Sequence, residues 1–214
     1  ELYRRRQCKE NEPHGPAVAQ RAPAFGVNVA EFDGDGREEL FLAQNFFPTE
    51  IATMRFDAGV GLVLLGDGTG GFRALGVPEA GIVVRGDSRG SAVADFDADA
   101  RPDLAVSQNA GATTLWRNVA GEQGVRVRLI GPPANPAGIG ARISLFGSGW
   151  QGPTRSVAAG SGYWSSDSPV QVLGGRSRAD SVRVRWPSGV ETVAPLGGSA
   201  LEVVIRVPGN PSRR

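Results

Sequence analysis

The chain has 214 residues but only one cysteine and one histidine. The single cysteine, Cys8, excludes an internal disulfide and any zinc site built from several cysteines. The single histidine, His14, lies in a segment rich in proline and glycine, which argues against a Ser–His or His–carboxylate catalytic centre. The composition therefore disfavours the enzyme classes that depend on these two side chains.

Long apolar runs are also missing. No stretch approaches the roughly 20 apolar residues of a membrane-spanning helix, and no secretory signal peptide is recognisable. Because the first residue is Glu1 rather than Met, we expect the chain to be a piece of a longer protein. The missing targeting segment then carries no information about location.

Glycine and proline are abundant, with 31 and 15 residues, and segments with helical periodicity are few. This pattern predicts an all-β chain of short strands joined by tight turns. Residues 1–124 carry 12 basic and 18 acidic side chains, whereas residues 125–214 carry 11 basic and 4 acidic ones. Such asymmetry predicts two units with separate surfaces. The arginines of the basic half alternate with Val, Leu and Ile, which predicts a solvated strand face and no nucleic-acid partner.

The most informative feature is an acid-rich loop that occurs twice, 64 positions apart, at 31–39 (loop one) and at 95–103 (loop two). Carboxylates occupy loop positions 1, 3, 5 and 9, which are Glu31, Asp33, Asp35 and Glu39 in loop one and Asp95, Asp97, Asp99 and Asp103 in loop two. Acids this close repel one another, and a hard cation with oxygen ligands, usually Ca²⁺, compensates them. The alternative is that the acids merely solvate turns. Two copies in register favour the metal.

The match between the copies extends beyond the acids. Residues 26–30 align with 90–94, and residues 40–45 align with 104–109. A further apolar strand follows each copy, at 62–65 and at 113–116, and the first copy then turns through 66–71 into Phe72. Four short strands per period predict a propeller blade.

The loop pattern D-x-D-x-D-G-x-x-D-L, followed by an apolar strand, resembles the FG-GAP/VCBS repeat of integrin-type β-propellers. The resemblance implies one Ca²⁺ per loop, held by the four carboxylates and by the backbone carbonyl at position 7, which is Arg37 in loop one and Arg101 in loop two. Loop one departs from the family pattern with Glu31 and Glu39 in place of Asp. Loop two has Ala98 and Ala100 where glycine is usual, and a positive φ at Ala100 would cost about 1 kcal/mol.

From about Val125 the pattern changes to alternating strands separated by turn residues. We expect strands near 125–130, 138–146, 154–158, 170–173, 181–186 and 201–207. Alternation with closely spaced turns predicts a small antiparallel β domain.

Three ordered motifs lie in this second unit: Gly138-Ile139-Gly140-Ala141-Arg142, the stretch 160–166 that contains Tyr163 and Trp164, and Trp186-Pro187-Ser188-Gly189. Together they resemble the ASPIC/UnbV domain, which follows FG-GAP repeats in the cartilage acidic protein family and its bacterial relatives. The residues 170–175 replace an HFGLG-like segment that is typical of relatives, so any role of its histidine is missing. The resemblance implies two partial propeller blades at 1–121, a β-sandwich-like domain at 122–208, and a tail at 209–214.

The aromatic residues of these motifs have two interpretations. A tryptophan at a strand end before a Pro-Ser-Gly turn commonly anchors the turn to the core, so we expect a structural role for Trp186. Tyr163 and Trp164 follow a Gly-Ser-Gly segment, and we expect them at a contact surface.

The leading hypothesis is a non-enzymatic, calcium-binding adhesion or scaffold module that is secreted, periplasmic or on the cell surface, with a protein or glycan partner. One rival is a carbohydrate-binding module that uses Tyr163, Trp164 or Trp186. Another is a carboxylate-pair glycoside hydrolase, although no feature marks two acids across a cleft. An accessory role in a bacterial secondary-metabolite pathway is a further alternative that the resemblance leaves open.

Overall fold

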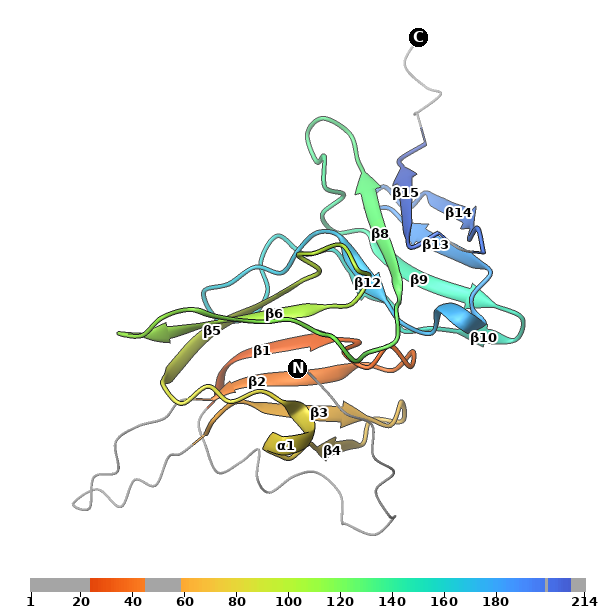
Figure 1. Cartoon of the computed structure of the whole chain (residues 1–214). Helices are drawn as coiled ribbons and strands as arrows, with labels where there is room; N and C mark the ends of the chain where they lie inside the picture. The colour runs from red at the N-terminus through yellow and green to blue at the C-terminus, as the bar shows by residue number, and fades with distance from the viewer. Residues whose placement is uncertain (1–23, 45–58, 199, 209–214) are drawn as a thin grey trace, which may run out of the picture.

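The computed structural model describes residues 24–44, 59–198 and 200–208, so Cys8, His14 and the expected tail at 209–214 lie outside the described residues. Over the described residues the chain is all-β, apart from the short helix α1 (Val77–Ala80) and the 3₁₀ turn η2 (Arg176–Arg178). Its strands form four sheets, none of which closes into a barrel (Figure 1). The all-β prediction is confirmed.

The first repeat forms a four-stranded antiparallel sheet in the order β1-β2-β3-β4. Its strands are β1 (Ala24–Ala30), β2 (Glu39–Gln44), β3 (Leu62–Gly66) and β4 (Phe72–Ala74). Side chains alternate between the two faces of a strand. In β2, Phe41 and Ala43 therefore enter one apolar cluster, while Leu42 enters another on the opposite face.

The second repeat forms a three-stranded sheet of β5 (Asp87–Ala94), β6 (Asp103–Asn109) and β7 (Thr114–Trp116). The expectation of four strands per period therefore holds for the first repeat and is wrong for the second. After Trp116 the chain does not turn back into another strand. Instead, the Glu122 amide donates to the Asp33 carbonyl at 2.8 Å, so this segment covers loop one.

The two repeat sheets pack on each other through a shared core. Phe32, Phe41 and Val63 of the first repeat meet Val93 and Leu104 of the second, and all five side chains are at most 8% exposed. Burying a large apolar side chain contributes roughly 1.5–3 kcal/mol. In Figure 1 β1 and β2 of the first sheet run beside β5 and β6 of the second, below the C-terminal strands.

The C-terminal unit is a sandwich of two sheets. One contains β9 (Arg142–Gly147), β10 (Trp150–Gln151), β11 (Arg155–Ser156), β13 (Ser181–Arg185) and β14 (Glu191–Pro195). The other has the order β12-β8-β15, with β8 (Val125–Ile130), β12 (Gln171–Leu173) and β15 (Glu202–Arg206). Val127, Ile143, Val184 and Ile205 from both sheets fill the core between them. The expected sandwich-like arrangement is present.

One pairing differs from the purely antiparallel prediction. β15 pairs with β8 in parallel, with Glu202 opposite Arg126 and Arg206 opposite Ile130. Parallel partners need a long crossover connection, and here nearly the whole unit lies between its first and last strands. Alternation within a strand does not reveal the direction of its partner, so the sequence could not predict this pairing. β14 and the two-residue β10 were also not predicted.

Candidate metal centre

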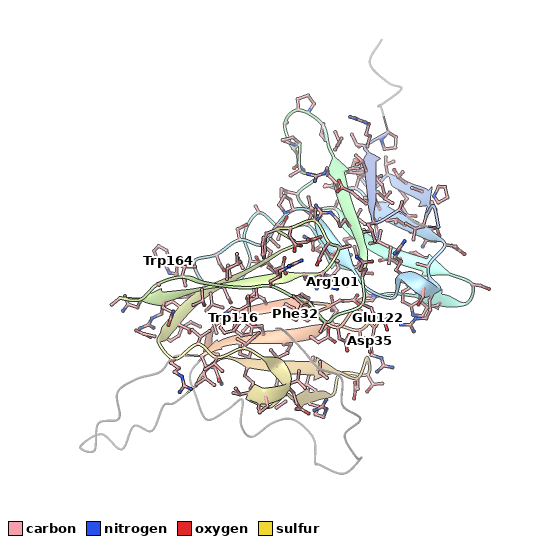
Figure 2. The ribbon with its side chains drawn as sticks, in the orientation of Figure 1. Phe32, Asp35, Arg101, Trp116, Glu122 and Trp164 are labelled. Carbon is pink, nitrogen blue, oxygen red and sulfur yellow. The ribbon has the colours of Figure 1, made fainter. Side chains whose placement is uncertain are left out.

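Both acid loops connect the first and second strands of their repeats and face the C-terminal unit. Loop one lies between β1 and β2, and loop two lies between β5 and β6. Figure 2 places Asp35 and Phe32 of loop one and Arg101 of loop two close to Glu122, where the chain passes from the repeats toward the C-terminal sheets. Loop one is therefore largely covered where the two units meet, whereas Phe96, Asp97 and Ala98 of loop two are exposed.

The backbone of both loops is shaped by short side chains and left-handed residues. In loop one the Asp35 amide donates to Asp33 Oδ1 at 3.0 Å, and the Arg37 amide donates to Asp35 Oδ1 at 2.9 Å. Positive φ values occur at loop positions 4 and 6: 77° at Gly34, 88° at Gly36, 63° at Ala98 and 65° at Ala100. The expected strain at Ala100 is confirmed, and Ala98 carries the same penalty of about 1 kcal/mol.

The structure brings together three carboxylates in each loop. Ligand atoms of Asp33, Asp35 and Glu39 lie within 4.8 Å of one another, and the same holds for Asp95, Asp97 and Asp99. Glu31 and Asp103, which were also predicted as ligands, are not members of these tight groups. The roles expected for the carbonyl groups of Arg37 and Arg101 stay predictions.

Two carboxylates of loop one are buried without adequate compensation. Glu31 and Glu39 are each 1% exposed. Both carboxylate oxygens of Glu31 and Oε2 of Glu39 lack a hydrogen-bond partner of good geometry among the described residues. A buried ionised carboxylate without partners is strongly unfavourable. This side of loop one therefore needs either protons or a cation.

The pKa values of the two glutamates reflect this environment. Burial raises the pKa of Glu31 from 4.5 to about 8, although the nearby positive charge of Arg155 opposes the shift. Burial, reinforced by the negative charges of Asp33 and Asp35, raises the pKa of Glu39 from 4.5 to about 9. Shifts of this size mark groups whose charged form lacks stabilisation in the folded chain.

In loop two, arginine side chains form ion pairs with the carboxylates. Arg101 Nη1 lies 2.9 Å from Asp99 Oδ2, and Arg117 Nε lies 2.5 Å from Asp97 Oδ2. Arg126 of β8 pairs with Asp95. In loop one, Arg37 is 3.7 Å from Asp35. Arg155 also lies 3.1 Å from Glu38, so both loops have arginines nearby and differ in which carboxylates the arginines pair with.

The C-terminal unit also contacts the backbone of loop one. The Gly175 amide donates to the Gly34 carbonyl at 2.9 Å, and Arg178 donates to the Asp35 carbonyl. A Cβ atom at Gly174 would lie 2.9 Å from the carbonyl carbon and oxygen of Gly34, which are backbone atoms, so glycine is required at this close approach. Arg155 of β11 pairs with Glu38 at 3.1 Å and donates to the Val29 carbonyl.

The residues that surround the loops were not predicted from the sequence. Asn118 donates its amide to Asp103 Oδ1 at 2.7 Å and its side chain to the Phe32 carbonyl at 2.6 Å, so it joins the two loops. Arg126, Arg155 and Arg178 lie between 31 and 143 positions from their acceptors. The basic composition of the second unit was the available signal, but it does not specify which arginine reaches which loop.

The three aromatic residues have separate environments. Trp186 is 3% exposed, belongs to the sandwich core, and donates to Thr192 Oγ1 at 2.9 Å, which agrees with its expected structural role. Trp164 is 90% exposed, and Tyr163 is 39% exposed with its ring 5.3 Å from that of Phe25. Trp186 is therefore unsuited to ligand stacking, whereas Trp164 is available for it.

Comparisons with known proteins bear on both units. Residues 131–200 match the family model "ASPIC and UnbV". This match supports the ASPIC/UnbV resemblance of the C-terminal unit. No comparison shows the FG-GAP repeats.

Curated relatives align with most of the chain. Cartilage acidic protein 1 of Mus musculus is 26% identical over 199 residues, and that of Homo sapiens is 27% identical over 199 residues, each covering 90% of this chain. The protein of the same name from Xenopus tropicalis is 32% identical over 111 residues, or 49% of this chain. The chain spans 30%, 29% and 17% of the lengths of these three relatives.

Proposed function

We propose that this chain is a non-enzymatic, calcium-binding module of an extracellular adhesion or scaffold protein, and that loop one is its principal calcium site. Asp33, Asp35 and Glu39 would hold the ion, with Glu31 adjacent. The ion would add positive charge beside the buried oxygens of Glu31 and Glu39. Binding energy would then become folding energy for the junction of the two units.

The observation that carries this proposal is a set of buried carboxylate oxygens that lack hydrogen bonds of good geometry among the described residues: both oxygens of Glu31 and Oε2 of Glu39. Glu39 Oε2 is buried and unpaired, and Glu39 shares a tight group with Asp33 and Asp35. If these acids were exposed at the surface, water would solvate them and they would need no ion. Buried, unpaired oxygens beside two further carboxylates fit a cation.

The donor set favours calcium over other metals. The tight group of loop one consists of three carboxylates and contains no histidine or cysteine. Zinc and copper prefer nitrogen and sulfur ligands, whereas calcium accepts several carboxylate oxygens in flexible geometry. Extracellular modules bind Ca²⁺ with dissociation constants of about 10⁻⁴–10⁻³ M.

The repeats also support an FG-GAP-type propeller. Phe32 of loop one is 4% exposed because the second repeat packs on it, whereas its equivalent in loop two, Phe96, is 51% exposed. Val63 is 3% exposed and its equivalent Leu115 is 59% exposed. The second sheet thus exposes the face whose equivalent in the first sheet is buried against the second repeat. It fits a further repeat of the same kind.

The comparisons and the remaining acids support an extracellular, non-enzymatic role. The relatives are named cartilage acidic proteins, and in the described part of the chain no helix is long and apolar enough to cross a membrane. Three acids of the C-terminal unit are engaged in structural contacts: Asp167 with Asn28, Asp180 with Ser181, and Glu202 with Arg126. These contacts disfavour a hydrolytic carboxylate pair.

A calcium titration by isothermal calorimetry tests the proposal. We expect the wild-type chain to bind Ca²⁺ with a dissociation constant of about 10⁻⁴ M. Asp35→Asn should weaken binding at least tenfold, roughly 1.4 kcal/mol, because it removes one charged ligand. Glu191→Gln on β14 is the control and should bind like wild type. Absence of binding by the wild-type chain, or undiminished binding by Asp35→Asn, would contradict the proposal.

A second candidate function, carbohydrate binding, is favoured by the presentation of Trp164. Its backbone has a positive φ of 51°, which is uncommon outside glycine. The loop around it is held by the Ser161 amide on the Ser165 carbonyl at 3.1 Å and by the Asp167 amide on Ser161 Oγ at 2.7 Å. An exposed indole on such an ordered loop suits stacking on a sugar ring.

Glycan-array binding by two variants, each lacking one exposed apolar side chain, tests this second function. If Trp164 forms a stacking platform, Trp164→Ala should weaken binding of any glycan the wild type retains by on the order of tenfold or more. Leu115→Ala, at another exposed apolar position, should have no effect. Unchanged binding by Trp164→Ala would rule out this second function.

A further inference from the structure

The two acid loops differ most at position 1, where the family pattern expects equivalent ligands. In loop one, neither carboxylate oxygen of Glu31 has a hydrogen bond of good geometry among the described residues, although the Gly174 backbone and Arg155 lie near it. Asp95 of loop two accepts from protein donors on both oxygens, because the Asp99 amide donates to its Oδ1 at 3.1 Å and the Ala100 amide donates to its Oδ2 at 2.9 Å. Arg126 Nη1 adds a third, charged donor to Oδ2.

Position 9 shows the same contrast. Glu39 has an unpaired Oε2. Asp103 has a donor on each oxygen, with the Asn118 amide 2.7 Å from Oδ1 and the Phe96 amide 3.1 Å from Oδ2. Both acids are 1% exposed. At equal burial, each oxygen of Asp103 has a donor, whereas Glu39 Oε2 has none of good geometry among the described residues.

Arg126 is placed to supply charge to loop two from outside the repeat. It lies on β8, the first strand of the C-terminal unit, and its side chain is 9% exposed against 1% for Asp95. Its Nε also lies 3.1 Å from Glu202 Oε2 on β15. One buried guanidinium thus joins loop two to the parallel strand pair that opens and closes the sandwich.

We infer that Arg126 supplies in loop two the positive charge that Ca²⁺ supplies in loop one, so that the chain binds one calcium ion rather than two. The inference rests on the calcium-binding function proposed above. A fixed guanidinium and a calcium ion compete for the same carboxylate of Asp95, because an ion there would lie beside an unscreened positive charge. Arg101 and Arg117 reinforce the exclusion through Asp99 and Asp97.

The inference also assigns loop two a function of its own. The pairing of Arg126 with Asp95 attaches the second repeat to the C-terminal unit without a metal. Loop one performs the equivalent attachment through backbone contacts from Gly175 and Arg178, beside the oxygens of Glu31 and Glu39 that lack hydrogen bonds of good geometry. The junction at loop two therefore forms without a metal, and calcium at loop one would add to the contacts that Gly175 and Arg178 already make.

Calcium stoichiometry, measured by equilibrium dialysis against ⁴⁵Ca²⁺, tests the inference with variants matched by loop position. Asp33→Asn and Asp97→Asn both alter position 3, in loop one and loop two respectively. We expect one ion per wild-type chain, none in Asp33→Asn, and one in Asp97→Asn. Circular dichroism would verify that each variant is folded.

The outcomes separate the two claims. Two ions per wild-type chain, one of them lost in Asp97→Asn, would overturn the inference and leave the proposed function standing. Zero ions would overturn the proposed function and the inference together. Arg126→Met, which keeps most of the packing volume without the charge, should bind a second ion if it folds. If Arg126→Met folds and still binds only one ion, then Arg126 is not the charge that keeps calcium out of loop two. If this variant does not fold, the number of ions bound by Asp97→Asn decides.

Discussion

Without calcium, the chain should lose stability as the pH rises from about 5 to about 9. Glu31 and Glu39 have pKa values of about 8 and about 9 in the folded state, against 4.5 ordinarily. Above pH 4.5 the unfolded chain releases these protons while the folded chain retains them, so the free energy of unfolding falls with pH. The loss is complete only above the folded-state pKa values.

The expected effect is large. Each unit of raised pKa corresponds to roughly 1.4 kcal/mol, and two carboxyl groups are shifted, so a total loss of several kcal/mol is expected. That is a substantial part of the 5–15 kcal/mol that typically stabilises a domain. Asp103, whose pKa burial raises from 3.8 to about 6, adds a smaller loss that is complete at lower pH.

Urea unfolding in EDTA at pH 5, 7 and 9 measures this dependence. The unfolding midpoint should fall across the series for the wild-type chain. Glu39→Gln preserves the side-chain shape without the titrating proton, so its midpoint should fall less steeply. A wild-type midpoint that does not change between pH 5 and 9 would contradict this prediction, because it would mean that the folded chain stabilises the charged forms of both glutamates.

The second large effect is expected from Asp167→Ala. Asp167 belongs to the C-terminal unit, yet its Oδ1 accepts from Asn28 Nδ2 at 2.9 Å and from the Val93 amide at 2.7 Å. These donors lie on β1 and β5, so one carboxylate joins both repeats. The neighbouring Ser168 amide donates to the Val93 carbonyl at 2.9 Å and extends this contact along β5.

Removing the Asp167 carboxylate takes the acceptor from the Val93 amide and one of two acceptors from Asn28 Nδ2, which keeps the Ser91 carbonyl, and each lost partner costs about 1–3 kcal/mol. We therefore expect Asp167→Ala to reduce the free energy of unfolding by roughly 2–4 kcal/mol in chemical denaturation. The control is Asp180→Ala, because Asp180 is exposed and accepts from the neighbouring Ser181 hydroxyl. Equal losses in the two variants would contradict the role of Asp167 as a junction between the units.

The local features of the fold were predictable from the sequence because they depend on local periodicity. Alternation located β8 and β13, and the acid loops marked the turns between β1 and β2 and between β5 and β6. The positive φ of Ala100 followed from the resemblance, because glycine is usual at this loop position. The sandwich role of Trp186 followed from its position before a Pro-Ser-Gly turn.

The features that required the structure are long-range. The parallel pairing of β15 with β8 joins residues 76 positions apart, such as Glu202 and Arg126. The loops look alike in sequence, and loop two even has the more favourable ligands. Their difference comes from which arginines and amides reach them, and Arg126 is fixed in place by a sheet whose topology the sequence does not specify.

The central claim is that a calcium ion compensates the acids of loop one, and the melting temperature at pH 8 tests it most directly. In 10 mM CaCl₂, about 100 times the expected dissociation constant, the gain should be about 2.7 kcal/mol, which raises the melting temperature by roughly 5–10 °C over that in EDTA. The rise should be smaller at pH 6, where protons compete for Glu31 and Glu39. Identical melting temperatures in calcium and EDTA at pH 8 would contradict the account.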